Sequence, residues 1–281
     1  MITTETPTAP ARTGRDGFLD VTFARRGART VLARSRWTLP LQILAPLALD
    51  DPASVVSILN PTGGLVGGDR LAIDVAVGEG AHACLTTPSA TKVYRTTGAM
   101  AEQRVRVSVA RGATLEWVPD HTIPYAGSAF RQSIDVDVAA GATVVLVDAF
   151  SAGRVARGEA WQFTWLESRL SVTDAQGPIV HDRFVLDGGA GAMPLGGAES
   201  HPYFASVVVV ADVDLDALVA ALDRSAADIT GATVATARLS RRGVAVRCLA
   251  ADAPALTDAL DALWAGARGA LGLAPLALRK P

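Results

Sequence analysis

The sequence predicts a mainly β protein of stacked β-sheets, β-helix-like layers formed by repeated strand-turn units, with two helices in a C-terminal α+β part. Three observations support this: a repeated glycine-turn frame, apolar alternation typical of strands through the first two thirds, and helical periodicity confined to the last third. We expect a stacked β-sheet region over residues 18–200 and an α+β region over 201–281, packed on it as one globular unit. Residues 1–17 are rich in threonine and proline, and we expect a disordered tail there.

The repeated frame is V-x-x-G-A-x-x-x-apolar, and it occurs three times, around Gly80, Gly112 and Gly141. These glycines are 32 and 29 residues apart. Each copy reads as the end of one strand, a glycine turn and the start of the next strand, which favours similar β units stacked on one another. No strong helical period appears over 18–187, so an alternating βα architecture is excluded.

Other strands and both helices are expected from hydrophobic periodicity. The helices have apolar residues at i, i+3, i+4 and i+7, and Asp212 or Asp214, and Asp252, are their expected N-caps. The expected helices are 215–224 and 255–268, and the expected strands outside the repeat are 18–24, 29–37, 39–44, 54–59, 161–172, 179–186, 203–210, 233–239 and 244–249.

Composition indicates a soluble protein that stays in the cytoplasm. Hydrophobic residues make up 49% of the chain and the formal charge is -2, which disfavours nucleic-acid binding. The N-terminus lacks the apolar core of a signal peptide, and no apolar run is long enough to span a membrane. Cys84 and Cys248 are too few for a disulfide framework, so we expect reduced thiols.

A glycine-rich loop at residues 60–71, N-P-T-G-G-L-V-G-G-D-R-L, separates two of the expected strands. It does not fit the phosphate-binding GxxxxGK[ST] loop, because Asp69 and Arg70 stand where the lysine and the hydroxyl residue should be. The dinucleotide pattern GxGxxG also fails, and no helix is predicted to follow. Nucleotide binding by this loop is therefore not expected.

Proline-interrupted segments follow the first two copies of the repeat, and a glycine-rich segment with several charges follows the third, at 85–95, 116–125 and 148–159. Because they occupy equivalent connections, we expect them to converge on one side of the stack. A further feature is a local excess of arginine near the N-terminus, which is either a solvated face or a surface for a partner: Arg25, Arg26, Arg29, Arg34 and Arg36.

The four segments 60–71, 86–95, 115–123 and 153–159 resemble, in this order, the motifs of the UreD/UreH urease accessory proteins. Four ordered motifs are a more specific signal than any one of them. The sequence departs from the family pattern at Thr62, where a second proline is usual, and at Asp120–His121, where Gln–Glu is usual. The second difference displaces a carboxylate and adds an imidazole.

The resemblance implies a non-enzymatic scaffold that helps insert nickel into apo-urease. It implies partners of the UreF and UreG type, the latter supplying GTP hydrolysis, in a hetero-oligomer with apo-urease subunits. It also implies a β-rich fold with two helices and an internal route for nickel. No permanent cofactor is expected, and nickel(II) would be held only transiently.

Transient nickel transfer favours separated oxygen and nitrogen ligands, because a closed four-ligand site would retain the ion. For each acid the competing interpretation is a capped turn or a partner of arginine, and for Cys84 it is a buried small apolar residue. Asp69 and Glu159 are the strongest candidates. The residues proposed to line a nickel path are Asp69, His82, Cys84, Glu116, Asp120, His121, Asp148 and Glu159.

Other motif residues are expected to shape loops, pack or contact partners rather than to act chemically: Gly63, Gly64, Gly67, Gly68, Arg70, Lys92, Tyr94, Arg95, Trp117 and Arg154.

Two other functions remain open from the sequence. Stacked β units with several acids also occur in carbohydrate-active enzymes, where paired carboxylates flank the scissile bond. Aromatic residues at 5% are sparse for a sugar-binding cleft, which argues against that function. The third possibility is a generic protein adaptor, since a chain with 19% charged residues is expected to cover some apolar surface with another protein.

Overall fold

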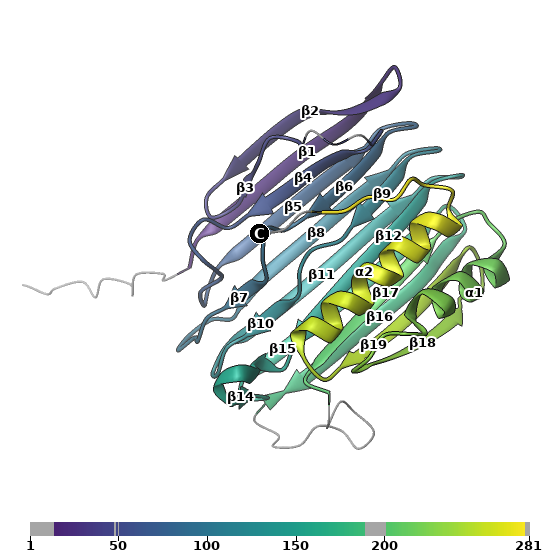
Figure 1. Cartoon of the computed structure of the whole chain (residues 1–281). Coiled ribbons are helices and arrows are strands. Elements are labelled where there is room, and N and C mark those ends of the chain that lie inside the picture. The colour runs from purple at the N-terminus through teal and green to yellow at the C-terminus, as the bar shows by residue number, and fades with distance from the viewer. Residues whose placement is uncertain (1–13, 48, 50, 189–200, 279–281) are drawn as a thin grey trace, which may run out of the picture.

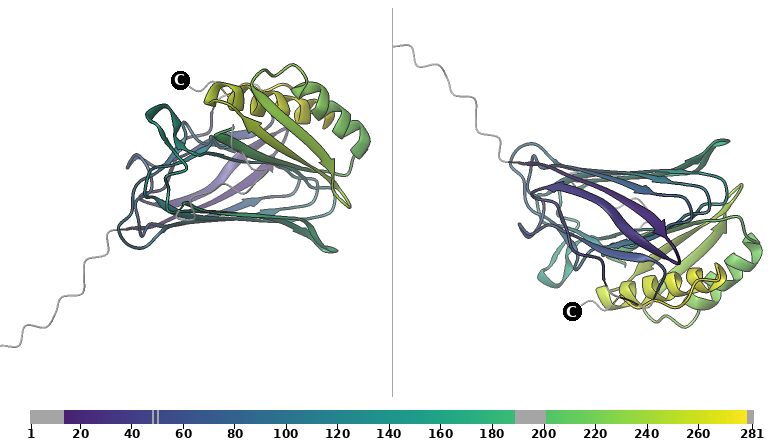
Figure 2. Two further views of the ribbon diagram at one scale, coloured as in Figure 1. Left: turned by 90° about the horizontal axis from the view of Figure 1, so that it is seen from below. Right: turned by 90° about the horizontal axis from the view of Figure 1, so that it is seen from above.

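The computed structural model describes residues 14–47, 49, 51–188 and 201–278. Two β-sheets face each other, and two helices cover the outside of one of them (Figure 1, Figure 2). The strands are β1 (Asp16–Arg26), β2 (Arg29–Thr38), β3 (Gln42–Ile43), β4 (Ser54–Leu59), β5 (Arg70–Val77), β6 (His82–Thr86), β7 (Thr91–Val93), β8 (Ala101–Val109), β9 (Thr114–Trp117), β10 (Thr122–Pro124), β11 (Ala129–Val138), β12 (Thr143–Ser151), β13 (Gly153–Arg154), β14 (Glu159–Ala160), β15 (Trp165–Asp174), β16 (Gly177–Asp187), β17 (Tyr203–Val210), β18 (Ala232–Arg238) and β19 (Gly243–Ala250). The helices are α1 (Leu215–Ala226), α2 (Ala253–Ala270) and a 3-10 turn, η1 (Val155–Arg157).

Among the described residues, the first sheet has seven strands in the order β16-β15-β11-β8-β5-β1-β2. The second has ten strands: it follows the order β18-β19-β17-β12-β9-β6-β4-β3, and β7 and β10 pair beside β12. Successive layers contribute one strand to each sheet, and β5, β8, β11 and β15 are parallel, as are β4, β6, β9 and β12. The predicted stack of β layers is therefore confirmed.

Glycine turns connect the two sheets at the same place in successive layers. Gly80, Gly112 and Gly141 all have positive φ, at 61°, 62° and 69°, a conformation that costs glycine little. The turns also bond to one another: the Gly80 amide donates to the Arg111 carbonyl at 3.1 Å. The repeat detected in the sequence thus marks one edge of the stack.

The main core lies between the two sheets. Alternate residues of each strand point inward, as in β5, where Leu71, Ile73, Val75 and Val77 are each at most 3% exposed. Side chains from both sheets meet in this core, and Phe130, Phe150 and Leu146 are fully buried there. Burial of this apolar area is the main stabilising contribution to the stack.

The C-terminal part continues the ten-stranded sheet instead of starting a separate one. Strand β17 pairs antiparallel with β12, and β19 and β18 follow it. Both helices pack on the outer face of this part of the sheet, forming a second core with Leu218, Leu222, Leu256 and Leu263 buried (Figure 1, Figure 2). The expected boundary near residue 200 falls in 189–200, outside the described residues, as does most of the expected N-terminal tail.

Helix starts follow the expected caps. The Asp214 carboxylate accepts hydrogen bonds from the backbone amides of Asp216 and Ala217, and the Asp252 carboxylate accepts one from Ala255. Asp212, the other candidate, binds an arginine instead.

One expected strand is much shorter than predicted. The apolar run 39–44 forms only the two-residue strand Gln42–Ile43, because Pro40 has no amide hydrogen to donate and the chain turns there, with the Leu41 amide bonded to the Thr38 carbonyl.

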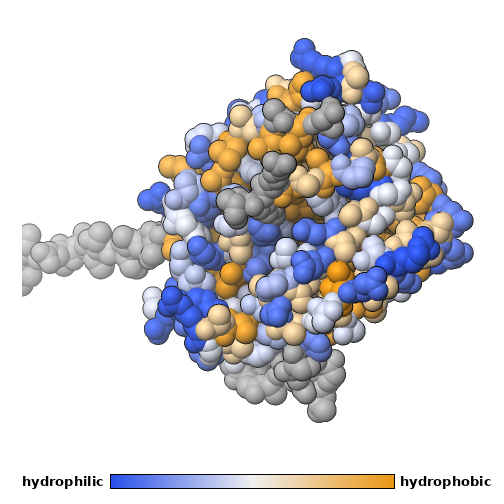
Figure 3. Space-filling model, in the orientation of Figure 1, coloured by the Kyte–Doolittle hydropathy of each residue, from blue (hydrophilic) through white to orange (hydrophobic). Residues whose placement is uncertain are grey.

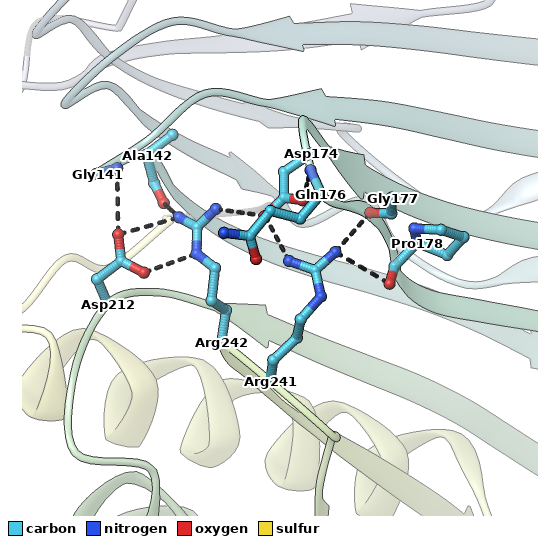
Figure 4. Close-up of polar contacts among 9 residues, drawn as sticks. All are labelled: Gly141, Ala142, Asp174, Gln176, Gly177, Pro178, Asp212, Arg241 and Arg242. Atoms are coloured by element: carbon cyan, nitrogen blue, oxygen red, sulfur yellow. Dashed lines mark hydrogen bonds and ion pairs between the residues drawn. The ribbon is translucent and has the colours of Figure 1, made fainter.

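Two adjacent arginines join the C-terminal part to the stack (Figure 4). Arg241 and Arg242, in the turn between β18 and β19, both bind the Asp174 carboxylate, at 2.6 Å and 3.0 Å. Arg242 also binds Asp212 at 2.6 Å, and Asp212 accepts the amide of Gly141. Hydrogen bonding from Arg241 holds the pKa of Asp174 well below its ordinary value, so this carboxylate stays ionised and joins the β15–β16 turn to the β18–β19 turn. Arg242 and Asp212 extend the contact to the turn at Gly141.

We expect Asp174→Asn to lower the melting temperature by several degrees, because it leaves two partly buried guanidinium groups without their shared carboxylate. The control is Asp74→Asn, since Asp74 pairs with Arg106 at 2.8 Å but about half of each side chain is exposed. Surface pairs contribute little, so this change should be nearly neutral. Thermal unfolding followed by circular dichroism compares them, and equal melting temperatures for the two variants would contradict the bridging role.

Candidate functional site

The four motif segments lie next to one another along one side of the stack, at the same end of its strands, although whole layers separate them in the chain (Figure 1). Leu65 of the glycine loop forms a parallel bridge with Val93 of β7, and β7 pairs with β10. Thr122 of β10 in turn pairs with Phe150 of β12. Gly153 lies beside the Pro124 carbonyl. The expected convergence of the connections on one side of the stack is confirmed, and we call this region the motif end.

Glycines make this close approach possible. A Cβ on Gly64 would lie 2.5 Å from the Lys92 carbonyl oxygen, and one on Gly67 would overlap the Thr96 side chain. Gly63 and Gly68 have φ values of 89° and 86°, which side chains other than glycine rarely adopt. Both glycine pairs therefore combine one residue of positive φ with one residue that leaves no room for a Cβ.

A row of polar and aromatic groups crosses the surface of the motif end. Glu159 and Arg154 form a double hydrogen bond, with Nε 2.7 Å from Oε2. The Arg154 guanidinium lies over the Tyr125 ring, 4.2 Å from its centre, and Tyr125 meets Tyr94 edge to face at 5.2 Å. The Tyr94 hydroxyl donates to the Gly63 carbonyl at 3.1 Å. The row thus links the segments 148–159, 116–125 and 85–95 to the glycine loop.

Asp69 closes the glycine loop. Its side chain is buried, at 2% exposure, and accepts backbone hydrogen bonds from Arg15 at 2.8 Å and from Val66 at 2.9 Å. Both of these donors are backbone amides, whereas the expected competitor was the side chain of the adjacent Arg70. The carboxylate therefore ties the loop to the start of β1.

A chain of buried charges lies on the outer face of the ten-stranded sheet, under α2. His82 and Glu116 are 2.6 Å apart, Nε2 to Oε1, and Trp264 donates to the other oxygen of Glu116. Arg268 binds both Glu116 and Asp51, the latter at 2.7 Å. Burial opposes ionisation of Glu116, but the hydrogen bond from His82 and the charge of Arg268 outweigh it, so its pKa lies below the ordinary value. The arrangement anchors the C-terminal end of α2 to the stack.

Three more predicted residues lie on the same outer face. Cys84 is fully buried in the second core, as the competing interpretation expected. Asp120 and His121 line a groove of about 270 Å³ beside Trp264 of α2, and the ring of His121 meets that of Tyr203 edge to face.

Asp148 lies on the opposite face of the ten-stranded sheet, between the two sheets. Its carboxylate accepts hydrogen bonds from Gln132 at 2.8 Å and from Ser168 at 2.7 Å, and Gln103 donates to Gln132 at 3.0 Å. Burial raises the pKa of Asp148 to about 6, although the Ser168 and Gln132 hydrogen bonds act in the other direction. We call these four residues the inter-sheet polar cluster.

Sequence reasoning missed three members of this cluster. Gln103, Gln132 and Ser168 occupy neighbouring register positions of β8, β11 and β15. Each stands at an inward position, where the alternation otherwise places apolar residues such as Ile134. A polar residue at the inward position of three successive strands is the signal that would have revealed the cluster.

The eight proposed nickel-path residues therefore lie in four places. Asp69 is in the glycine loop, Glu159 is on the surface of the motif end, and Asp148 is between the sheets. The others are on the outer face under or beside α2: His82, Cys84, Glu116, Asp120 and His121. No group of three or more metal-ligating side chains that could hold an ion was found among the described residues.

The remaining motif residues serve the packing of the motif end or of the core. Trp117 is buried between the sheets, at 4% exposure. The Lys92 carbonyl accepts the Leu65 amide at 2.8 Å, and the Arg95 side chain packs against Gly127. Arg70 begins β5, exposed at the start of the strand.

Comparison with known proteins identifies the family. A family model described as UreD urease accessory protein matches residues 15–280. The chain belongs to the UreD family. The resemblance inferred from the four motifs is confirmed, and it extends through the C-terminal helices. No helix among the described residues is long and apolar enough to cross a membrane.

Several curated relatives named urease accessory protein UreD match over much of this chain. The protein from Deinococcus radiodurans is 37% identical over the full length of both chains. That from Haloarcula marismortui is 36% identical over 91% of this chain and 87% of its own. That from Dechloromonas aromatica is 44% identical over 60% of this chain and 59% of its own. These relatives are named as accessory proteins and not as enzymes, which fits a non-enzymatic role.

We expect the stability of this UreD chain to depend on pH through Asp148. Its folded pKa of about 6 lies above the ordinary 3.8, so its contribution is fully present below pH 3.8 and is lost as the pH rises through 6. Asp148→Asn should remove this loss, which urea unfolding at several pH values can measure. Asp137→Asn, at an exposed position of β11, should keep the wild-type profile. The same slope in both variants would argue against a buried, titrating Asp148.

We expect Gly64→Ala to destabilise the motif end, because the added Cβ would lie 2.5 Å from the Lys92 carbonyl oxygen. Overpacking of this kind costs about 1–3 kcal/mol. Gly98→Ala is the matched control, since a Cβ there meets nothing within 4 Å. Amide hydrogen exchange of β7 and β10 should rise only in Gly64→Ala; unchanged exchange in that variant would refute the proposed close packing.

Proposed function

We propose that this chain is a scaffold for urease maturation that binds apo-urease together with UreF-type and UreG-type proteins and helps deliver nickel. Membership of the UreD family supports the accessory role. The observation that carries the proposal is the motif end, where three separate family-like segments join in one hydrogen-bonded ladder and the fourth, 153–159, packs beside it.

The motif end has the chemistry of a protein-binding surface. Tyrosine and arginine are the residues that contribute most often to binding energy at interfaces. Here Tyr94, Tyr125 and Arg154 are held in place before any partner binds, by the Gly63 carbonyl, by each other and by Glu159. Side chains ordered in advance lose less entropy on binding, which favours affinity.

Nickel is cargo in this proposal and not a resident cofactor. Its ligands would be carboxylate, imidazole and amide oxygen groups, which suit nickel(II). Asp148 offers such a carboxylate in the interior, surrounded by the amide of Gln132 and the hydroxyl of Ser168. The eight candidate residues lie in four places, so their contacts with the ion would be separate ones and not those of a single tight site.

GTP hydrolysis is assigned to the UreG-type partner. The glycine loop lacks the lysine of a phosphate-binding loop, and the Asp69 carboxylate, which stands in its place, closes the loop itself.

The decisive experiment is reconstitution of apo-urease with the UreF-type and UreG-type proteins, nickel and GTP, with and without this chain. We expect ureolysis and protein-bound nickel to rise at least ten-fold when the chain is present. Equal activation without it would overturn the proposal. Binding to urease with no gain in nickel content would favour a generic adaptor.

The role of the motif end is tested with Tyr94→Ala and Arg154→Ala together. We expect urease activation to fall at least five-fold, because the ordered row is broken on both sides of Tyr125. Arg106→Ala is the control, since Arg106 also pairs with a carboxylate but lies on the seven-stranded sheet away from the motifs. If the control variant loses as much activation as the double variant, the motif end has no special role.

A further inference from the structure

The outer face of the seven-stranded sheet is open. Figure 2 shows both helices on the other side of the molecule, outside the ten-stranded sheet. Sheets of parallel strands are usually covered on both faces, but β5, β8, β11 and β15 have no element packed on their outer face in the described part of the chain. Figure 3 looks onto the helix-bearing side, where hydrophobic surface gathers in the upper part. The outer face of the seven-stranded sheet instead presents mostly charged, small and hydroxyl-bearing side chains, and we call it the open sheet face.

Two rows of charge cross the open sheet face from β5 to β15. The side chains of each row occupy neighbouring register positions of successive strands, and their signs alternate from strand to strand. The second row lies four residues further along each strand and has the opposite signs. The first row is Arg70, Glu102, Arg131 and Glu167, and the second is Asp74, Arg106, Asp135 and Ser171.

Charges of both rows pair within their own sheet and are still accessible. Arg106 binds Asp74 at 2.8 Å, and Arg131 lies 3.7 Å from Glu102. The side chains of these four residues are 46% to 56% exposed, and that of Asp135 is 35% exposed. Exposed pairs of this kind contribute little to stability by themselves. A second layer of charges can therefore share them without breaking them.

We propose that the open sheet face binds the same face of a second copy of this chain, about a twofold axis that runs parallel to the strands between β8 and β11. This axis places β8 of each copy on β11 of the other, and β5 on β15. Glu102 then faces Arg131 of the second copy, and Arg106 faces Asp135 of the second copy. Each contact occurs twice in a symmetric pair, so opposite charges meet throughout the centre of the interface.

The flanking strands fit the same axis. Asp74 faces the hydroxyl of Ser171, which can donate to it. Arg70 faces Glu167, but this contact contributes less, because Glu167 is only 8% exposed and its carboxylate binds Arg183 at 2.8 Å. The association therefore depends on the four central residues of β8 and β11.

Arg104 and Arg169 exclude a different symmetric arrangement. They lie in the row between the two charged rows, together with Ala72 and Ser133. A twofold axis along this middle row would also bring opposite charges together, but it would place each of the two arginines on its own copy, which repulsion disfavours. The axis between β8 and β11 instead places Arg104 on Ser133 and Arg169 on Ala72.

The open sheet face is large enough for a dimer. The six strands from β16 to β1, about 4.8 Å apart and about eight residues of about 3.3 Å rise each, give it an area of roughly 750 Å² per copy. A standard interface buries about 800 Å² on each partner. Because charged groups form most of the contact, we expect the dimer to dissociate as the salt concentration rises.

The test uses two variants of the full chain, Glu102→Arg and Arg131→Glu. In the first, positions 102 and 131 are both basic, and in the second both are acidic, so each variant repels its own copy. In an equal mixture, position 102 of one variant faces a residue of opposite charge at position 131 of the other. Arg238→Glu is the control, since Arg238 is exposed and pairs with Asp216 away from the open sheet face. Sedimentation velocity measures dimerisation, and melting temperatures establish that all variants are folded.

We expect the wild type and the control to dimerise at about 50 mM salt and to be monomers at about 500 mM salt, where screening is strong. Each variant alone should dimerise about ten-fold more weakly or worse, because like charges face each other twice. The mixture should form heterodimers with an affinity close to that of the wild type. A charge reversal that acts only within one sheet does not predict this recovery.

Three outcomes would overturn the inference. A wild-type chain that stays monomeric at low salt lacks the interface. Single variants that dimerise like the wild type use another surface. A mixture that fails to recover dimerisation excludes the axis between β8 and β11. Dimerisation is independent of the proposed function, because the test contains this chain alone: Arg106→Ala should weaken the dimer and leave urease activation unchanged.

Discussion

Parallel, in-register pairing of successive layers is the constraint on which the rest of this structure depends. Each layer repeats a strand, a glycine turn and a strand, and the turns at Gly80, Gly112 and Gly141 keep the register by adopting the same positive φ. A slip of one residue would place every inward side chain outside. Register therefore controls the core, the ladder of motifs and the orientation of each buried polar group at once.

The stack brings together residues that are distant in sequence, because equivalent parts of successive layers lie side by side. The motif segments meet because each leaves its layer at an equivalent point, and their short strands then pair as the long ones do. Buried and surface groups of the motif end are in this way kept apart: Asp69 closes a loop inside, while Arg154 and the two tyrosines lie nearer the surface.

Two buried carboxylates show how environment decides the behaviour of similar groups. Glu116 is fully buried but meets Arg268 and His82, so it stays ionised and holds α2. Asp148 is also buried but meets neutral donors, Gln132 and Ser168, so burial dominates and its pKa rises. An ionised anchor and a titrating interior group thus occupy opposite faces of one sheet.

The sequence by itself determined the layered β architecture, the glycine turns, both capped helices and the four motifs, because these depend on local period and backbone conformation. Tertiary structure decided what each polar side chain meets. Period-two alternation shows that Gln132 and Asp148 point into a sheet face, but it does not show that they face each other across two sheets. Nor does local pattern reveal that Arg268 reaches Glu116 and Asp51, 152 and 217 positions away, since only packing of the helix on the sheet creates those contacts.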